Sequence, residues 1–208
     1  MLASRQTPED YLAASLSGKK RKELRRQHTR LAELGEVGFA RDSTGDGLEA
    51  WAARFLALEQ AGWKGKAGSA LASHTGTAAL FCESLRGAVE QDRLERLTLS
   101  LDGRAIAMLV NFITPPGAFS YKTAYDEDYA RFSPGVLLQC ENLQLLARPD
   151  IAWTDSCAAA DHPMIGHIWR ERRALGRVSI AIGGRLRRCA FGALLRLELG
   201  RNPTGVSA

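Results

Sequence analysis

The sequence predicts a mixed α/β (α+β) fold, in which a mainly antiparallel sheet is flanked by helices. Apolar residues recur at helical spacing over residues 48–62 and 76–89. From Leu94 the apolar period changes to two, and a following Asp-Gly pair supplies a two-residue hairpin turn. A strand over residues 118–125 completes a three-stranded meander, which leads into an apolar helix. The expected order of elements along the chain is β-α-α-β-β-β-α-β-α-β.

Composition and charge set the broad class of the protein. The 208 residues are 45% hydrophobic and 25% charged, as expected for one globular domain with extensions. The formal net charge of +5 permits an anionic partner without requiring one. We expect neither a secretory signal nor a membrane-spanning helix, which needs about 20 apolar residues. Scattered cysteines predict reduced thiols in a cytoplasmic protein and no bound metal: Cys82, Cys140, Cys157 and Cys189.

The first predicted helix runs from about Ser17 to Leu34, with Ser17 as its cap and Gly35 as its stop. Residues 1–16 are expected to form an N-terminal extension before it. Residues 19–30 are strongly basic and suit contact with tRNA, an anionic membrane or a phosphorylated ligand. A solvated helix face explains their charge equally well.

Two helices and a glycine-rich segment follow a short predicted strand at residues 36–41. The first helix, residues 48–62, begins after a TGDG turn. The stretch GWKGKAGSAL at residues 62–71 is typical of an ordered functional loop. The second helix, residues 76–89, is expected to pack through Leu80, Phe81, Leu85 and Ala88 or Val89.

The second and third strands of the meander are expected to differ in the polarity of their two faces. Residues 104–114 are apolar on both faces, which predicts a central strand. Regular alternation along residues 118–125 assigns six side chains to the two faces. One face would carry Phe119, Tyr121, Thr123 and Tyr125, and the other Ser120 and Lys122.

The helix after the meander, residues 133–147, is predicted to be buried because apolar residues cover most of its surface. Ser133 can cap this helix and Pro134 suits its first position, while Gly135 allows a ligand to approach the backbone. The unpaired N–H groups and the helix dipole would favour a phosphate there. An ordinary capped core helix is the alternative.

The last third of the sequence predicts a strand at residues 150–155, a helix at 163–170 and a strand at 177–182. The main domain is therefore expected to span residues 17–183. A basic amphipathic helix and tail occupy residues 184–208, and this helix could lie on a membrane surface or pack on the domain.

Three motifs, together with the order of elements, resemble the GNAT superfamily of N-acetyltransferases. They are LEQAGWKGKAGSAL at 58–71, KTAYDEDYARFSPGVLLQ at 122–139 and DSCAAADHPMIGHIWRERR at 155–173. They look like the bacterial branch described for cellulose or exopolysaccharide biosynthesis, which is related to Fem-type peptidyltransferases. The sequence departs from the family at its pyrophosphate loop, Q/R-x-x-G-x-G/A, where Pro134 replaces the first glycine. It is also short, because relatives commonly carry a further N-terminal unit.

The resemblance implies a site for acetyl-CoA or another acyl-CoA where the meander meets the helix at residue 133. Arg131 and Ser133, with the N–H groups of Gly135, Val136 and Leu137, are the expected anchors for its pyrophosphate. The GWKG stretch and the third strand of the meander are expected to contribute residues to the acceptor or acyl site. These residues are Trp63, Lys64, Tyr121 and Lys122.

Acyl transfer also requires groups that move protons. We expect Asp155 or His162 to act as the base and Tyr125 to protonate the leaving thiolate. In the alternative interpretation, Asp155 only caps a turn and His162 only caps the helix at residue 163. Cys157 is expected to be a structural thiol, since nothing in the sequence supplies a partner to activate it.

The sequence therefore predicts an acyltransferase that moves an acyl group from acyl-CoA to an amine or hydroxyl. A cell-envelope or exopolysaccharide precursor is the expected acceptor, and the enzyme would be cytoplasmic or peripheral to the inner membrane. One alternative is a Fem-like enzyme that takes an aminoacyl group from tRNA. Another is a degenerate GNAT-fold module that binds without catalysis.

Overall fold

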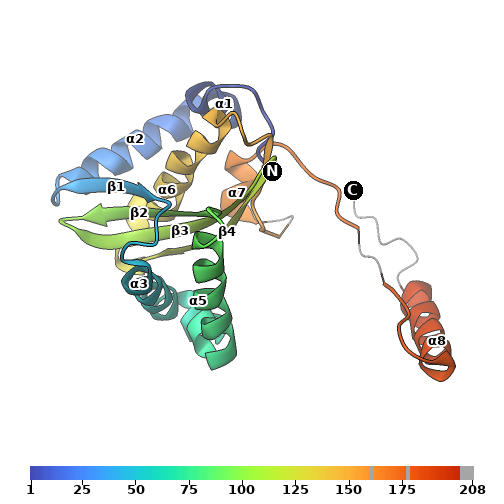
Figure 1. The fold of residues 1–208 in the computed structure, drawn as a ribbon. Helices are drawn as coiled ribbons and strands as arrows, with labels where there is room; N and C mark the ends of the chain where they lie inside the picture. The colour runs from blue at the N-terminus through green and yellow to red at the C-terminus, as the bar shows by residue number, and fades with distance from the viewer. Residues whose placement is uncertain (160–161, 177–178, 202–208) are drawn as a thin grey trace. The chain divides into compact units, whose positions relative to one another are not determined.

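A computed structural model describes residues 1–159, 162–176 and 179–201 of the chain (Figure 1). The chain divides into two compact units, residues 1–172 and 173–208. The first unit contains the following elements: α1 (Pro8–Ser15), α2 (Gly18–Ala32), β1 (Val37–Asp42), α3 (Leu48–Ala61), α4 (Trp63–Lys66), η1 (Leu71–Ser73), α5 (Thr75–Val89), β2 (Leu94–Leu101), β3 (Arg104–Thr114), β4 (Gly117–Tyr125), η2 (Glu127–Phe132), α6 (Pro134–Asn142), η3 (Leu143–Ala147), β5 (Trp153–Asp155) and α7 (Pro163–Ile168). The second unit contains α8 (Arg185–Arg201).

The strands form one five-stranded sheet in the order β1-β2-β3-β4-β5. The first four strands are antiparallel neighbours, and β5 runs parallel to β4. β3 is central, and its residues 106–111 are all buried. These observations confirm the predicted fold class, the three-stranded meander and the central position of residues 104–114.

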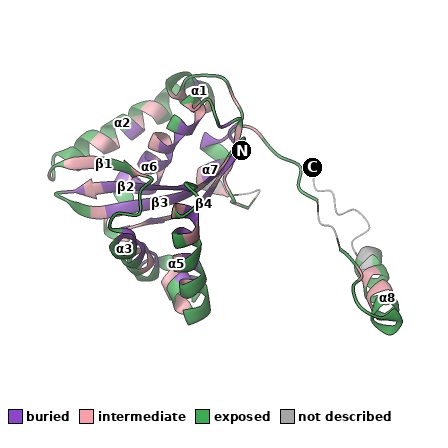
Figure 2. Ribbon diagram, in the orientation of Figure 1, coloured by how far each residue is buried: buried purple, intermediate pink, exposed green. Residues whose placement is uncertain are grey.

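The sheet lies between two layers of helices (Figure 1). α3 and α5 cover one face through an aromatic cluster that includes Trp51, Phe55 and Phe81. α2 and α6 cover the other face, where Leu31 and Leu138 pack against leucines of β2 and β3. Buried residues concentrate in the strands and on the helix faces that meet them (Figure 2). The predicted burial of the helix after the meander is confirmed.

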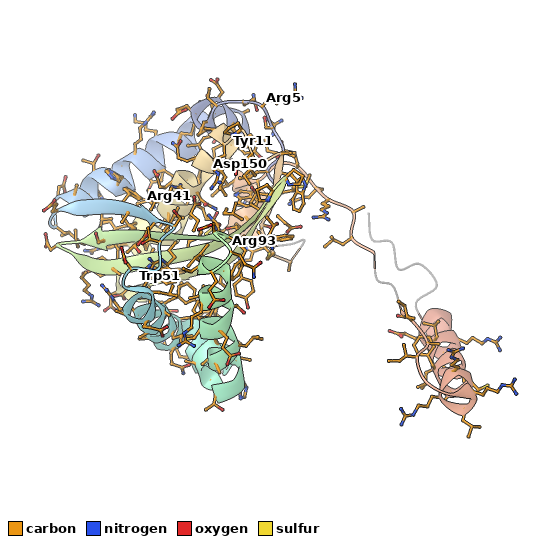
Figure 3. The ribbon with its side chains drawn as sticks, viewed as in Figure 1. Arg5, Tyr11, Arg41, Trp51, Arg93 and Asp150 are labelled. Atoms are coloured by element: carbon orange, nitrogen blue, oxygen red, sulfur yellow. The ribbon has the colours of Figure 1, made fainter. Side chains whose placement is uncertain are left out.

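The N-terminal residues are ordered before the first helix that the sequence predicted. Thr7 caps α1, and Tyr11 of this helix is fully buried beside Trp169. Leu2 pairs with Thr154 at the outer edge of β5. Figure 3 labels Tyr11 on α1 and Trp51 on α3, on opposite sides of the sheet. The Thr-Pro-Glu-Asp start of α1 is a helix signal that the prediction did not use.

Three further expectations differ from the structure. The glycine-rich segment is not a plain loop, because α4 forms within it. Leu80 does not pack on the sheet, since it is 63% exposed while Phe81 and Leu85 face the core. The strand expected at 177–182 is wrong for residues 179–182, which are in no strand, while residues 177 and 178 lie outside the described part. No helix among the described residues is long and apolar enough to cross a membrane.

Candidate active site

β4 extends beyond the point at which its pairing with β5 ends. The parallel ladder joins only three residue pairs, the last of which is Phe119 with Asp155. β4 continues to Tyr125, so its residues 120–125 have one edge that β5 does not pair. Such an edge presents backbone N–H and C=O groups to which an extended ligand can bind.

A β-bulge lies at the start of this open edge. Val110 of β3 pairs with Lys122, and the next residue, Asn111, pairs with Ser120, so Tyr121 is an extra residue in β4. The predicted alternation along β4 is therefore wrong. The Tyr121 ring lies against Phe112 on the α3 and α5 side, and Lys122 faces the same side.

Ser120 and Thr123 instead face α6. The Ser120 hydroxyl accepts a hydrogen bond from Asn142, and the Thr123 hydroxyl accepts one from Gln139. The bulge thus puts a tyrosine and a lysine side by side on one face of the sheet. A sequence pattern of period two cannot place two consecutive residues in this way.

Glu59 of α3 is the centre of a buried charged cluster beneath this bulge. Its Oε1 accepts hydrogen bonds from Lys122 Nζ at 2.6 Å and from Lys64 Nζ at 3.1 Å. Its Oε2 accepts the backbone N–H of Leu71 at 2.8 Å. The Glu59 side chain is 1% exposed, whereas the two lysine side chains are 21–25% exposed. The cluster therefore carries one excess positive charge that reaches solvent.

The ionised form of Glu59 is stabilised by these partners. Burial raises the pKa of Glu59, but the Leu71 N–H, the hydrogen bond from Lys122 and both lysine charges outweigh burial. The pKa of this carboxyl consequently lies below its ordinary value. A carboxylate held in this way positions cations and is a weak proton acceptor.

α4 is held over the cluster from two sides. Lys64 binds Glu59, and its Nζ also lies 3.4 Å from the carbonyl oxygen of Thr123 on the open part of β4. Glu127 of η2 accepts the backbone N–H of Trp63 at 2.6 Å and pairs with Lys66. The Trp63 side chain remains 56% exposed. The structure thus brings together Trp63, Lys64, Tyr121 and Lys122, the four residues predicted for the acceptor or acyl site.

Tyr121 lies between this cluster and the end of β5. Burial first, then the negative charge of Glu59, raise the pKa of Tyr121. Its hydroxyl therefore keeps its proton at neutral pH. Cys157 follows β5, and burial of its thiol together with Asp155 raises the pKa of Cys157 to about 11. A protonated thiol is a poor nucleophile, in agreement with a structural role for Cys157.

The start of α6 differs from the expected phosphate cradle. Ser133 has a left-handed backbone, with φ 53° and ψ 50°, and its side chain makes no capping bond. Its carbonyl oxygen accepts the N–H groups of Val136 at 2.9 Å and Leu137 at 3.0 Å. Gly135 is buried, and a β-carbon there would lie 3.3 Å from the ring of Tyr125. Two of the three expected backbone donors are thus already bonded within the helix.

Arginine side chains gather immediately before α6 instead. A cavity of about 380 Å³ lies between α2 and η2. Arg26, Arg30 and Arg131 line it with one acidic residue, Glu33, so its walls carry a net positive charge. The Arg131 guanidinium is fixed above the ring of Phe132, 4.6 Å from the ring centre. The predicted anchor Arg131 therefore lies with the arginines of α2.

α6 presents buried amide side chains to the open part of β4. Gln139 is 2% exposed, and its Nε2 donates to Thr123 Oγ1 at 3.1 Å. Its carbonyl oxygen, Oε1, is buried and has no hydrogen-bond partner in the part of the chain that the structure describes. An unpaired buried acceptor of this kind fits a ligand that donates an N–H.

The residues expected to move protons are spread around the end of β5. Asp155 occupies the last paired position, and its Oδ1 accepts the Cys157 N–H at 2.9 Å. His162 caps α7, where its Nδ1 accepts the Ile165 N–H. Tyr125 packs, partly buried, against the core on the α6 side, and it also lines a small pocket with Glu59, Trp63 and Lys64. The structure thus brings Asp155 and Tyr121, but not Tyr125, to the point at which β4 and β5 part.

Sequence reasoning missed two residues of the site, Glu59 and Gln139. Glu59 continues the buried face of α3 at four-residue spacing from Trp51 and Phe55, so a charge at a core position was the available signal. Gln139 is likewise a polar residue on a helix predicted to be buried. A polar residue on a core face usually has a buried partner.

Comparison with known proteins identifies the family of this fold and site. Residues 18–162 match the family model described as an acetyltransferase (GNAT) domain. A comparison with curated protein sequences finds no match.

Among solved structures, the chain is similar to two aminoglycoside acetyltransferases. One, meta-AAC0020 from an uncultured soil metagenomic sample in complex with sisomicin, is 12% identical with a TM-score of 0.47, covering 71% of this chain and 97% of that chain. The other, AAC(6')-Iy in complex with CoA, is 11% identical with a TM-score of 0.49, covering 71% and 96%.

The family match covers more than half of the chain. The fold and this match define an acyltransferase of the class that takes its acyl group from acyl-CoA. The chain belongs to the GNAT family of acetyltransferases.

Proposed function

We propose that the protein transfers an acyl group from acetyl-CoA or another acyl-CoA to an amine or hydroxyl of a cell-envelope or exopolysaccharide precursor. The open edge of β4, which begins at the bulge of Tyr121 and adjoins the Glu59 cluster, carries this proposal. The resemblance of residues 58–71, 122–139 and 155–173 to the exopolysaccharide branch supports the acceptor class. The reaction would take place in the cytoplasm or at the inner membrane surface.

Acyl-CoA would bind along the α6 side of the open edge. Phosphate groups of CoA suit the arginine cavity, since Arg30 and Arg131 supply charge-assisted donors beside Arg26, which is paired with Glu23. Gln139 Oε1 can accept an amide N–H of the pantetheine arm. The thioester would then lie near Tyr121, where β5 no longer pairs with β4.

Proton transfer follows from this placement. An attacking amine loses its proton to Asp155, and the departing thiolate takes a proton from the Tyr121 hydroxyl. His162 is the second choice as base. Its Nδ1 already accepts the Ile165 N–H, so the proton of the neutral ring lies on Nε2, and accepting a further proton would break the bond to Ile165. We prefer Tyr121 to Tyr125 as the acid because Tyr121 lies at the bulge, next to the last pair of β4 with β5.

The acceptor would bind on the α4 side, and we infer that it is an anionic sugar. Lys64 and Lys122 share one carboxylate, so a phosphate or carboxylate on the acceptor would balance their excess charge. The exposed Trp63 ring offers an apolar surface beside them for a sugar ring. Sites of this kind commonly combine an aromatic wall with a few converging polar groups.

Acetyl-CoA at 100 times its dissociation constant is expected to stabilise the folded protein by about 2.7 kcal/mol, which corresponds to a rise in Tm of about 5–10 °C. Arg131→Gln should weaken this effect through loss of a phosphate contact, and Arg54→Gln on the exposed face of α3 is the matched control. Thermal unfolding with and without the ligand measures both. An equal rise in Tm with acetyl-CoA in the two variants would show that the phosphate groups do not bind in this cavity.

The choice of acceptor gives a second test. With acetyl-CoA present, glucosamine 6-phosphate should release free CoA at least about tenfold faster than glucosamine at low concentration, because ion pairs with Lys64 and Lys122 hold the phosphate. A thiol reagent follows the released CoA. Lys122→Gln should reduce the preference, whereas Lys66→Gln, which removes an exposed cation of the same helix as Lys64, should leave it unchanged. No preference for the phosphorylated sugar would exclude an anionic acceptor.

A Fem-like transferase that uses aminoacyl-tRNA is the second candidate. The exposed basic surface of α2 favours it, with Lys19, Lys20 and Lys22 around one hollow. Salt-sensitive tRNA binding without acetyl-CoA binding would select this function. A module without catalysis would show no rise in Tm with any CoA ester.

A further inference from the structure

The C-terminal unit accounts for the net positive charge of the chain. Residues 173–208 contain seven arginines and one glutamate, a formal net charge of +6. The other 172 residues contain 21 lysines and arginines against 22 aspartates and glutamates, a net charge of −1. The sequence pI of about 9.2 thus reflects one short segment.

α8 of this unit combines that charge with an exposed apolar face. At about 3.6 residues per turn, Leu186, Ala190, Leu194 and Leu197 fall on one side of the helix. The three leucines are 88%, 67% and 64% exposed. Most of the helix is drawn as exposed in Figure 2, with some intermediate residues. A monomeric soluble surface rarely leaves such a row of leucines uncovered.

The arginines of α8 lie beside the apolar face and behind it. Arg185 and Arg196 follow one border of the leucine row, Arg187 the other, and all three are exposed. Long cationic side chains in this position can reach lipid headgroups while the leucines enter the acyl boundary. Nucleic acid would use the charge but would leave the leucines in water.

We propose that α8 binds flat on an anionic phospholipid surface. The occupant is inferred from charge complementarity and from the leucines together, since arginines near an anionic bilayer are attracted to its headgroups while leucines enter the acyl boundary. This inference goes beyond the transferase function and does not depend on it. The partner surface is the headgroup region of the bilayer.

α2 is the other basic helix, and the structure separates the two. The apolar residues of α2 are occupied in the fold, with Leu24 6% exposed and Leu31 fully buried. α2 can thus offer only charge to a membrane. Residues 19–30 provide a matched control for the role of the leucines in α8.

The test is sedimentation of the full chain with vesicles of phosphatidylcholine, with and without phosphatidylglycerol. Binding to anionic vesicles should exceed binding to neutral vesicles by at least about tenfold and should fall in high salt. Leu186→Gln/Leu194→Gln/Leu197→Gln keeps helix propensity and should reduce anionic binding about tenfold or more. Lys19→Gln/Lys20→Gln/Lys22→Gln should leave it nearly unchanged.

Several results would overturn the proposal. These are equal binding to both vesicle types, unchanged binding of the leucine variant, or loss of binding in the lysine variant alone. If the wild type is a dimer that does not bind vesicles, and the leucine variant is a monomer, the result would show that a second copy covers the leucines. An acetyl-CoA-dependent rise in Tm that is the same in wild type and leucine variant shows that the first unit is intact, which separates this test from that of the transferase.

Discussion

Replacing Glu59 by glutamine is expected to cost about 2–4 kcal/mol of folding free energy, because two lysines lose the carboxylate that pairs them. The Glu59 side chain is 1% exposed, so water cannot take its place at Lys64 and Lys122. Lys64 should also lose its fixed position on α4. Urea unfolding at pH 7 measures the loss, and released CoA measures the accompanying fall in turnover.

Glu49→Gln is the matched control for this change. Glu49 lies on the same helix and pairs with Arg86, but both side chains are more than half exposed. Exposed pairs of this kind contribute little, so the control should unfold almost as the wild type does. Similar losses in the two variants would show that the Glu59 cluster has no special place in the fold.

Acid should remove the same contribution. The pKa of Glu59 is lower in the folded state than its ordinary value of 4.5, so its stabilisation is complete above that value and is lost as the pH falls through the folded-state pKa. The urea midpoint of the wild type should therefore drop more steeply below about pH 4.5 than that of Glu59→Gln. Parallel curves would contradict the pairing seen in the structure.

Gly65→Ala is expected to displace α4 and to lower turnover by about tenfold to a hundredfold. A β-carbon at residue 65 would overlap the backbone carbonyl of Gln60, which cannot move without unwinding the end of α3. α4 must then lift away, which breaks the Lys64 contact with Glu59 and the Trp63 contact with Glu127. Hydrogen–deuterium exchange of residues 62–71 should increase, and overpacking should cost about 1–3 kcal/mol.

Gly87→Ala tests whether this effect is specific to α4. Gly87 lies within α5, and no atom lies within 4 Å of the position of its added β-carbon. Alanine there should stabilise the helix by about 0.5–1 kcal/mol and leave turnover unchanged. Normal exchange of residues 62–71 in Gly65→Ala would mean that α4 is not clamped as described.

The sequence could predict the elements whose signals are local. The period of two from Leu94, the Asp-Gly turn and the apolar helix after Pro134 each lie within a short window, and all three match the structure. The helix capped by Ser17 is confirmed because its cap is a single local residue, although the helix ends at Ala32, before the predicted stop at Gly35.

The geometry of the site depended on contacts between distant residues. The bulge arises between β3 and β4, so no pattern within β4 alone shows that Tyr121 and Lys122 share a face. Similarly, no local pattern shows that Ser133 has a left-handed backbone and makes no side-chain capping bond. The family resemblance predicted which segments contribute to the candidate site, and tertiary pairing decides which of their atoms face one another.

The bulge makes the length of β4 as important as its composition. Removal of Tyr121 alone would return the strand to an even pleat, with Ser120 still toward α6 and Lys122 still toward Glu59. The sheet would become more regular and would lose the bend at which its edge opens. One surplus residue therefore separates a strand that only packs from a strand that can also receive a ligand.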